Sequence, residues 1–440
     1  MVVYLDHAAG SPMPASVRAA YLAALGTVGN PSSIHSAGQA ARGLLEDSRA
    51  RIAATLGVDG VEVVLTGGGT EAVNLGVKGL WWARQGGGPG GSADRARIAR
   101  PRILVPRAEH HATLDAVEWL AAHEGATVTW LEVDAEGALR LDTLAAALAA
   151  SGTATGAPAT DAAGPDDPAT DVALLTLLWA NNEVGTLQPV AEAAALAAAH
   201  GVPVHVDAIA AYGQVPLAPL PAGVSALSIS AHKVGGPVGV GALVLRRGAE
   251  VVPLLHGGSQ QRGRSGTMDA AGAAAFAVAS DEAHAAITER AAHKARLRDR
   301  LAAGILAALP QVVLRGATGR AAVARAAGDE AGAERWAARA LPGTLHLTVP
   351  GAEGDSLLML LDLAGFAVST GSACQAGVPE PSHVLLAMGV DEPTARGALR
   401  ITVGPETTLG EIDALLAALP EAVARAEVAG LAARTPTLGR

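Results

Sequence analysis

Short apolar stretches alternate along the chain with alanine-rich segments whose apolar positions repeat at helical spacing. Five stretches have the length and composition of buried strands: 102–106, 127–133, 173–178, 202–207 and 241–246. Helical periodicity marks three segments between them: 113–123, 141–150 and 190–200. Strands and helices that alternate in this way predict an α/β domain whose mostly parallel sheet is covered by helices on both faces.

The chain has 440 residues, which is long enough for two domains. After Leu341 a strand pattern returns at 343–349 and helical segments follow, which predicts a smaller α+β domain at the C-terminal end. We expect residues 1–14 to pack against this small domain, residues 15–287 to form the large domain, and residues 288–440 to form the small one.

Three further stretches depart from the alternation, and we interpret them as surface insertions. Residues 85–100 are rich in Gly, Arg and Ala, and residues 151–171 are rich in Gly, Ala, Thr, Pro and Asp. Residues 316–341 are alanine-rich and charged, which is compatible with either a loop or a loosely attached helix.

The acidic balance of the chain argues against nucleic acid as a partner. The formal net charge is −10, whereas phosphate contacts need clustered Lys and Arg side chains. The N-terminus lacks the pattern of a signal peptide, and no apolar run reaches the ~18 residues of a membrane-spanning helix. A single cysteine cannot form an internal disulfide, which agrees with a reducing compartment. We therefore expect a cytoplasmic protein without membrane contact.

Lys233 is the first candidate for chemistry, because it directly follows an apolar strand pattern. A buried lysine with a lowered pKa can bind an aldehyde cofactor as a Schiff base. An isolated lysine at a strand end would more often point to solvent. Asp207 ends the predicted strand 202–207, and an aspartate at that sheet edge can keep a pyridine nitrogen protonated.

A glycine turn supplies the third feature. Residues 65–71 lead from a strand pattern through three glycines into a helix. The bare amides and the Thr70 hydroxyl at this helix start predict a phosphate cradle. Many ordinary helix starts look the same, so the turn alone is weak support. Turn, aspartate and lysine in this order are much stronger together.

The ordered motifs of this chain resemble those of the cysteine desulfurases, class V enzymes with the fold of pyridoxal-phosphate (PLP) dependent aminotransferases. The matching motifs span nearly the whole chain outside the three insertions: 4–9, 29–33, 70–71, 109–110, 180–185, 206–208, 232–233, 264–267, 371–374, 380–385 and 399–400. The resemblance implies a PLP-dependent transferase of fold type I, a homodimer, L-cysteine as substrate and a protein as sulfur acceptor. The long loop before residue 380 is similar to that of the branch that serves iron–sulfur cluster assembly and transfer-RNA thiolation.

The resemblance also implies roles for individual residues. Lys233 carries pyridoxal 5'-phosphate as a Schiff base, Asp207 pairs with its pyridine nitrogen, and His110 stacks on the ring and moves protons. Arg400 and Asn182 bind the substrate carboxylate, a task suited to a bidentate guanidinium. The other implied cofactor contacts are those of Gly69, Thr70, Ser230 and His232 with the phosphate, of Asn182 near the phenolic oxygen, and of Thr267 from the partner subunit. No residue is expected to bind a metal.

Cys374 is the predicted sulfur carrier. A lone cysteine is more often buried and inert. This one lies between Gly371 and Gly377 among small and polar residues, which predicts a mobile, exposed loop. A thiolate on such a loop can attack the substrate's sulfur and carry it as a persulfide to an acceptor.

Three positions depart from the family pattern. Ala210 stands where the family has a glutamine that hydrogen-bonds the phenolic oxygen, Pro405 replaces an arginine, and the segment 257–264 is shorter than usual before Thr267. Two other functions stay open at this point. One is a class V selenocysteine lyase, aminotransferase or C–S lyase that transfers no persulfide. The other is a degenerate cofactor-binding scaffold that docks a partner protein.

Overall fold

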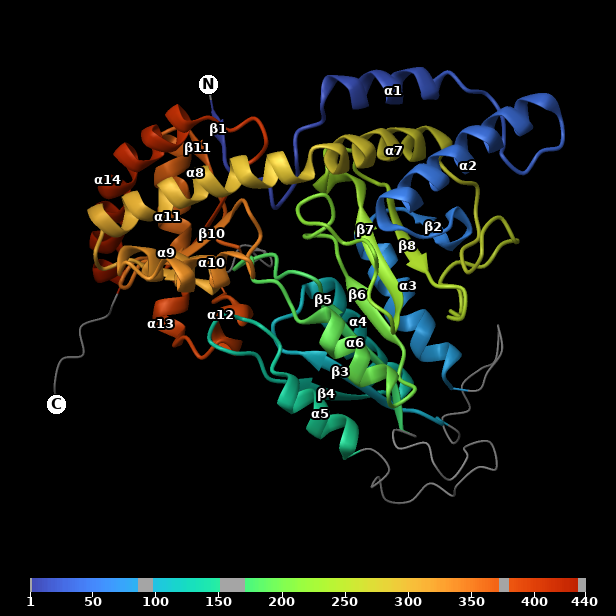
Figure 1. Cartoon of the computed structure of the whole chain (residues 1–440), viewed down its shortest axis with the longest axis horizontal. Coiled ribbons are helices and arrows are strands. Elements are labelled where there is room, and N and C mark those ends of the chain that lie inside the picture. The colour runs from blue at the N-terminus through green and yellow to red at the C-terminus, as the bar shows by residue number, and fades with distance from the viewer. Residues whose placement is uncertain (1, 86–97, 151–170, 372–379, 434–440) are drawn as a thin grey trace.

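The computed structural model describes residues 2–85, 98–150, 171–371 and 380–433, which form two lobes with separate hydrophobic cores (Figure 1). The larger lobe is built around a seven-stranded sheet, and the smaller lobe around a three-stranded antiparallel sheet. The predicted α/β architecture with a smaller α+β part is therefore confirmed. Within the described residues, no helix combines the length and the apolar character that a membrane crossing requires.

The large sheet has the strand order β2-β8-β7-β6-β5-β3-β4. Its strands are β2 (Val63–Thr66), β3 (Arg102–Pro106), β4 (Thr127–Leu131), β5 (Val172–Leu178), β6 (Val204–Asp207), β7 (Val224–Ser230) and β8 (Gly241–Leu245). Neighbouring strands are parallel except at β8, which runs antiparallel to both β2 and β7. The connection between β7 and β8, residues 231–240, is too short for the crossover that a parallel pair needs. The prediction of a mostly parallel sheet is confirmed, and every predicted strand of the large domain belongs to it.

Helices cover both faces of this sheet because its strands are apolar on both sides. One face is covered by α3 (Gly69–Ala83) and α4 (His111–Glu124). The other is covered by α2 (Ser36–Leu56), α5 (Leu141–Ala149), α6 (Val190–Ala198) and α7 (Ala270–Ala285), with α1 (Ala15–Leu25) packed on α7. Successive residues of one strand, such as Ile103 and Leu104, accordingly belong to cores on opposite faces.

The small lobe packs its sheet against long helices. The sheet consists of β9 (Val313–Arg315), β10 (Thr344–Thr348) and β12 (Ala398–Thr402) in the order β12-β10-β9. Its longer helices are α8 (Ile287–Ala308), α11 (Gly354–Leu363) and α14 (Leu409–Ala433), and it also contains the short helices α12 (His383–Ala387) and α13 (Glu392–Ala395) and two further helices within residues 316–341. At the other end of the chain, β1 (Val3–Tyr4) pairs in parallel with β11 (Phe366–Ala367), so the N-terminal strand joins this lobe (Figure 1).

The interpretation of residues 316–341 as a surface insertion is wrong. These residues form α9 (Gly316–Ala326) and α10 (Glu330–Ala337), and α9 packs against β9 and β10. Gly319 lies so close to the sheet that a Cβ atom there would be 2.5 Å from the carbonyl carbon of Leu314. The small residues of this segment allow its helix to pack closely on the sheet. An alanine- and glycine-rich composition is also typical of loops, so composition alone does not distinguish the two structures. Most of the predicted insertion 85–100, and all but the last residue of 151–171, lie outside the described residues.

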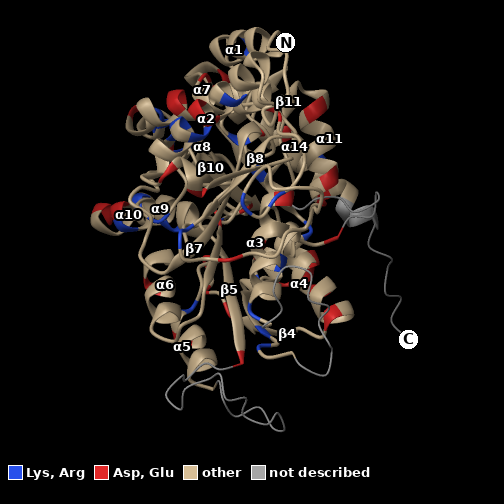
Figure 2. Ribbon diagram, turned by 90° about the vertical axis from the view of Figure 1, so that its right-hand side faces the viewer, with Lys and Arg blue, Asp and Glu red and all other residues tan. Residues whose placement is uncertain are grey.

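Charged side chains lie mainly on the outer helices, and the central strands are largely uncharged (Figure 2). One polar row crosses the buried sheet. The His205 ring on β6 lies between the hydroxyls of Thr176 on β5 and Ser228 on β7, at nitrogen–oxygen distances of 2.9 and 2.8 Å. Burial lowers the pKa of His205 to about 3, so this ring stays neutral inside the sheet.

We expect acid to destabilise the protein through His205. Its pKa is about 3 in the folded chain and 6.5 in its ordinary state, so below pH 6.5 the unfolded chain binds an additional proton. As the pH falls from about 6 to about 4, this proton difference should lower the free energy of unfolding of the wild type by about 1.4 kcal/mol per pH unit. The variant His205→Gln should lack this contribution. Urea unfolding at several pH values measures this difference, with the exposed His256→Gln as control. Parallel pH profiles for wild type and His205→Gln would contradict the prediction.

Candidate active site

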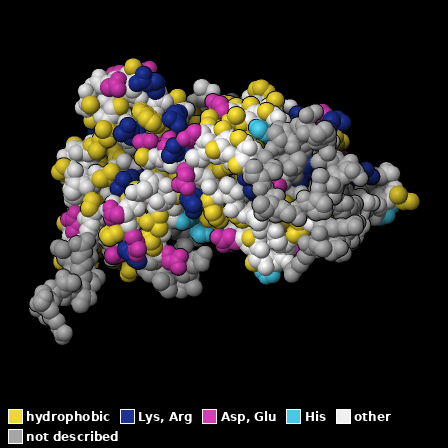
Figure 3. All heavy atoms as spheres, turned by 90° about the horizontal axis from the view of Figure 1, so that it is seen from below, with side chains coloured by type: hydrophobic (Ala, Val, Ile, Leu, Met, Phe, Trp, Pro, Cys, Tyr) yellow, Lys and Arg dark blue, Asp and Glu magenta, His cyan; other side chains and the backbone are white. Residues whose placement is uncertain are grey.

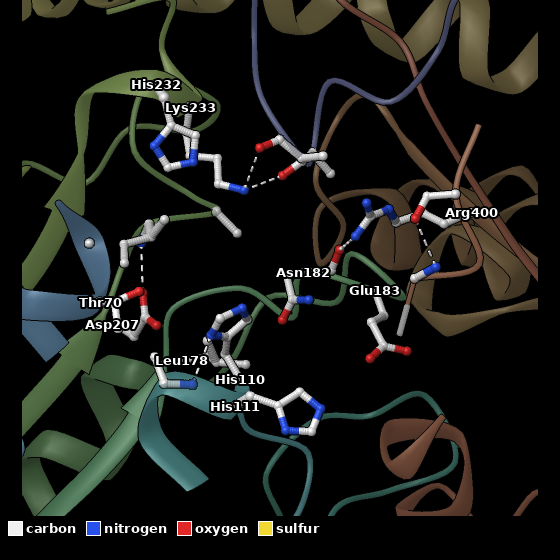
Figure 4. Close-up of a pocket in the computed structure, with 18 of the residues that line it drawn as sticks. Thr70, His110, His111, Leu178, Asn182, Glu183, Asp207, His232, Lys233 and Arg400 are labelled. Atoms are coloured by element: carbon white, nitrogen blue, oxygen red, sulfur yellow. Dashed lines mark hydrogen bonds between the residues drawn. The ribbon is translucent and has the colours of Figure 1, made fainter. Parts of the chain in front are cut away.

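A cavity of about 340 Å³ lies between the two lobes, beyond the carboxyl ends of β5, β6 and β7 (Figure 4). Most of the predicted site residues line it: Gly69, Thr70, His110, Asn182, Asp207, His232, Lys233 and Arg400. Ser230 is buried and, like Thr267, lies outside the cavity lining. Cys374 falls outside the described residues. Histidine side chains also lie at the edge of a hollow in the lower face of the molecule (Figure 3).

Lys233 enters the cavity from a single 3-10 turn, Ala231–Lys233, that follows β7. Its Nζ donates to the carbonyl oxygens of Ala8 and Ala9, and the second of these bonds is 3.2 Å long. Burial and the nearby Arg400 charge together lower the pKa of Lys233 to about 8, against the opposing effects of Asp207 and Asp6. The amine is therefore closer to its neutral, nucleophilic form than that of a surface lysine.

Asp207 is the last residue of β6 and is 2% exposed. Its Oδ1 accepts one hydrogen bond, from the backbone N–H of Ile209 at 2.9 Å. Burial raises the pKa of Asp207 to about 6, while the Ile209 N–H and the Lys233 charge oppose that rise. A carboxylate this poorly solvated is suited to a cationic partner in the cavity, such as a protonated ring nitrogen.

The start of α3 forms a glycine cradle. Gly68 precedes the helix at a φ of +140°, a conformation that favours glycine. A Cβ atom on Gly69 would lie 2.4 Å from Cδ1 of Ile209 and 3.2 Å from Cβ of Ser230, so the backbone at Gly69 lies close to both side chains. Thr70 follows in the first helical turn and lines the cavity. Free N–H groups at such a helix start attract a phosphate.

Histidines form the wall opposite Lys233 (Figure 4). His110 precedes α4, and its Nδ1 accepts from the Ala112 N–H at 3.1 Å, which puts the proton of the neutral ring on Nε2. Burial and the Lys233 charge lower the pKa of His110 to about 4. His111 packs edge-to-face on His383 with ring centroids 4.8 Å apart.

Arg400 approaches from β12 of the small lobe. It is 5% exposed, and its Nη1 donates to the carbonyl oxygen of Asn182 at 2.9 Å while Nη2 donates to Oδ1 of Asp6 at 2.8 Å. Its Nε is buried and has no hydrogen-bond partner among the described residues. A buried donor without a partner at a cavity wall is suited to an anionic ligand.

Several residues of the wall were not predicted as site residues. They are Ala8, Ala9, His111, Ala112, Leu178, Glu183, Ile209, Ala210, Ser369, Gly371 and His383. Some of them belong to motifs that carry the family resemblance, such as 4–9 and 380–385, and their place in these motifs could have identified them as site residues. Ala8 and Ala9 contribute carbonyl oxygens, and no side-chain pattern points to these.

The departures from the family pattern have different locations. Ala210 lines the cavity and also a smaller adjoining one of about 40 Å³, which Gln214 shares. Pro405 is exposed and lies outside the cavity lining. The segment before Thr267 is tied to the start of α3 by the ion pair of Arg264 with Glu71, at 3.0 Å.

The cavity fits pyridoxal 5'-phosphate. The amine of Lys233 matches the aldehyde of this cofactor, the buried carboxylate of Asp207 matches its pyridine nitrogen, and the glycine cradle at Gly69 matches its phosphate. His232 also lines the cavity, and its Nδ1 lies 2.8 Å from the hydroxyl of Ser230.

Comparison with known proteins agrees with this chemistry. The family model described as aminotransferase class-V matches residues 3–327. An IscS-like cysteine desulfurase from Mycobacterium tuberculosis is 46% identical over 433 residues, covering 98% of this chain and 99% of the relative. The chain belongs to the cysteine desulfurases of the class-V aminotransferase family. The predicted family and PLP-dependent fold are thereby confirmed.

Two further comparisons extend this result. A cysteine desulfurase IscS from Methanosarcina thermophila is 33% identical over 423 residues, covering 96% of this chain and 92% of the relative. Among solved structures, a NifS-like protein has a TM-score of 0.78 and 28% sequence identity, covering 97% of this chain and 100% of its own. The likeness to these two proteins therefore includes both lobes.

Lys233 should capture PLP through its neutral amine. Because the pKa of Lys233 is lowered to about 8, the rate at which cofactor-free protein binds PLP should rise with pH and level off above a midpoint near 8. An ordinary lysine would show a midpoint near ~10.4. Rapid-mixing absorbance at several pH values measures this rate, and Lys233→Ala should develop no cofactor band. A rate that is flat around pH 8 and rises only at higher pH would contradict the lowered pKa.

Proposed function

We propose that this cysteine desulfurase removes sulfur from L-cysteine, retains it as a persulfide on Cys374 and releases L-alanine. The observation that carries the proposal is that Lys233, Asp207 and Arg400 converge on one cavity in a chain of this family. An amine and a carboxylate suit the aldehyde and the ring nitrogen of PLP, and a guanidinium suits the carboxylate of an amino acid.

The residues around the cofactor hold it and move one proton. PLP, when bound, supplies an electron sink that stabilises negative charge on the α-carbon of an amino acid. Lys233 takes the α-proton, since a pKa of about 8 leaves part of the amine neutral near neutral pH. Asp207 stabilises positive charge on the ring nitrogen. The helix start at Thr70, with Ser230 and His232, binds the phosphate.

The substrate is oriented from the opposite side of the cavity. Arg400 binds its carboxylate, with Asn182 beside it, because both line the cavity and each terminal nitrogen of the guanidinium keeps one N–H beyond its bond to Asn182 or Asp6. His110 is our candidate for managing the thiol proton of the substrate. Its lowered pKa of about 4 keeps the ring neutral near neutral pH, with the proton on Nε2, so this nitrogen can donate a hydrogen bond to the substrate's sulfur.

Sulfur then passes to Cys374, which lies outside the described residues. The Cys374 thiolate attacks the substrate's sulfur, and a new S–S bond forms as the Cβ–S bond breaks. The electrons of the broken bond stay with Cβ, which takes a proton and becomes the methyl group of alanine. Ser369 and Gly371 line the cavity a few residues before Cys374, which supports this transfer.

We further propose a homodimer in which Thr267 contacts the cofactor phosphate of the partner subunit. Thr267 is exposed and lies outside the lining of its own cavity, which suits such a contact. The sulfur acceptor is an iron–sulfur scaffold or a thiolation enzyme, and a reducing cytoplasm keeps Cys374 available. Helix α8 connects the lobes and supports a boundary between domains 15–287 and 288–440, with residues 1–14 packed on the latter.

Cys374→Ala should lose sulfur release while keeping the cofactor. With L-cysteine and a thiol reductant, the wild type should form sulfide and alanine in equal amounts, and the variant should form at least about 100-fold less of both. Sulfide and alanine are measured in the same reaction, and an unchanged cofactor absorbance band shows that the variant is loaded. Full alanine release by the variant would contradict the carrier role and favour a lyase. No product from a PLP-loaded wild type would favour a docking scaffold.

A further inference from the structure

Residues 6–11 cross the cavity between the lobes, and we call them the N-terminal strap (Figure 4). The strap contacts both cationic groups of the site: the carbonyls of Ala8 and Ala9 accept from Lys233, and the side chain of Asp6 accepts from Arg400. It is therefore placed to set the geometry of a substrate that lies between the two.

The backbone around Asp6 is fixed to the strand that carries Arg400. Asp6 forms a parallel bridge with Thr402 of β12, and the N–H of Ala8 donates to the hydroxyl of Thr402 at 2.9 Å. The hydroxyl of Tyr4 donates to the carbonyl oxygen of Asp6 at 3.0 Å. Asp6 and Arg400 are thus held on neighbouring backbone segments.

Asp6 is the one carboxylate paired with Arg400 among the described residues. Directly across the small sheet, His346 on β10 is 0% exposed and neither of its ring nitrogens has a hydrogen-bond partner in the described chain. Burial and the charges of Arg400 and Arg315 keep that ring neutral, with a pKa lowered to about 3. His346 therefore packs beside Arg400 without compensating its charge.

The pairing leaves part of the guanidinium available. Arg400 has five N–H groups, of which one on Nη1 is bonded to Asn182 and one on Nη2 to Asp6. These two bonds fix the plane of the guanidinium and leave one N–H on each terminal nitrogen for a planar oxyanion, whereas the Nε–H is buried.

We propose that Asp6 is a positioning residue for substrate binding: its hydrogen bond to Nη2 holds the Arg400 guanidinium in the orientation that receives the substrate carboxylate. This rests on the proposed function, in which Arg400 binds that carboxylate. The charge of Asp6 compensates Arg400 in the free protein but does not favour substrate binding, because a second carboxylate near Arg400 repels the substrate carboxylate. Asp6 contributes by orienting the Arg400 guanidinium through its acceptor oxygen. An uncharged residue that offers an acceptor oxygen at the same place should therefore be able to replace it.

The test compares Asp6→Ala, which removes the acceptor, with Asp6→Asn, which keeps it. A hydrogen bond to a charged group is commonly worth about 1.5–3 kcal/mol, so Asp6→Ala should raise the KM for L-cysteine about tenfold or more. The kcat should stay within about threefold, because ground-state and transition-state binding are weakened together. Asp6→Asn should bring KM back to within about threefold of the wild type.

A spectroscopic measurement separates positioning from general disorder of the strap. Binding of L-cysteine and of cysteamine, which lacks the carboxylate, is followed by the change in cofactor absorbance of each PLP-loaded protein. Asp6→Ala should weaken L-cysteine and leave cysteamine unchanged. Asp413→Ala, which removes the carboxylate paired with Arg300 outside the cavity lining, is the matched control and should alter neither affinity.

A double-variant cycle decides whether Asp6 acts through Arg400. In an Arg400→Ala background, Asp6→Ala should add no further loss of L-cysteine affinity. An additive loss, an equal loss for cysteamine, or an Asp6→Asn protein as weak as Asp6→Ala would overturn the proposal. If Arg400→Ala itself left L-cysteine affinity unchanged, the carboxylate role in the proposed function would fail instead, so the two failures are distinguishable.

Discussion

Lys233 and Arg400 place two cationic groups at one enclosed cavity, and two carboxylates compensate them from different parts of the chain. Asp207 faces Lys233 from the end of β6, and Asp6 pairs with Arg400 from the N-terminal strap. Charges removed from water are tolerated only when they are paired and hydrogen-bonded. The cavity therefore exists only where the strap, the large sheet and the small lobe meet.

This constraint explains the arrangement of the elements around the site. The parallel strands β5, β6 and β7 end at one sheet edge, so Leu178, Asp207 and Lys233 reach the cavity together. β1 pairs with β11 in the small lobe and thereby carries the strap across the cavity to Lys233. The antiparallel sheet of the small lobe then presents Arg400 from the opposite side.

Much of this could be predicted from the sequence, because the buried strands are continuous apolar runs and the chemical residues follow them. Lys233 and Asp207 follow from strand ends, whereas Arg400 and Asn182 followed only from the family resemblance. The pairing of Asp6 with Arg400 joins residues at opposite ends of the chain, and no local pattern encodes it. The close packing of the helices at 316–341 was not predicted, because alanine and glycine are common both in loops and in closely packed helices. Cys374 and Thr267 retain their predicted roles as proposals.

The central claim is that this cavity holds PLP on Lys233. The chain has three lysines, and burial lowers the pKa of all three. For Lys233 and Lys294 the pKa falls to about 8. Lys294 lies outside the cavity and donates to Gln214, so a reactive amine alone does not decide the attachment site. Borohydride reduction of the PLP-loaded protein, followed by mass spectrometry of its peptides, identifies the modified residue. The account predicts the pyridoxyl group on Lys233 alone; a label on Lys294 or Lys78, or no label, would contradict it.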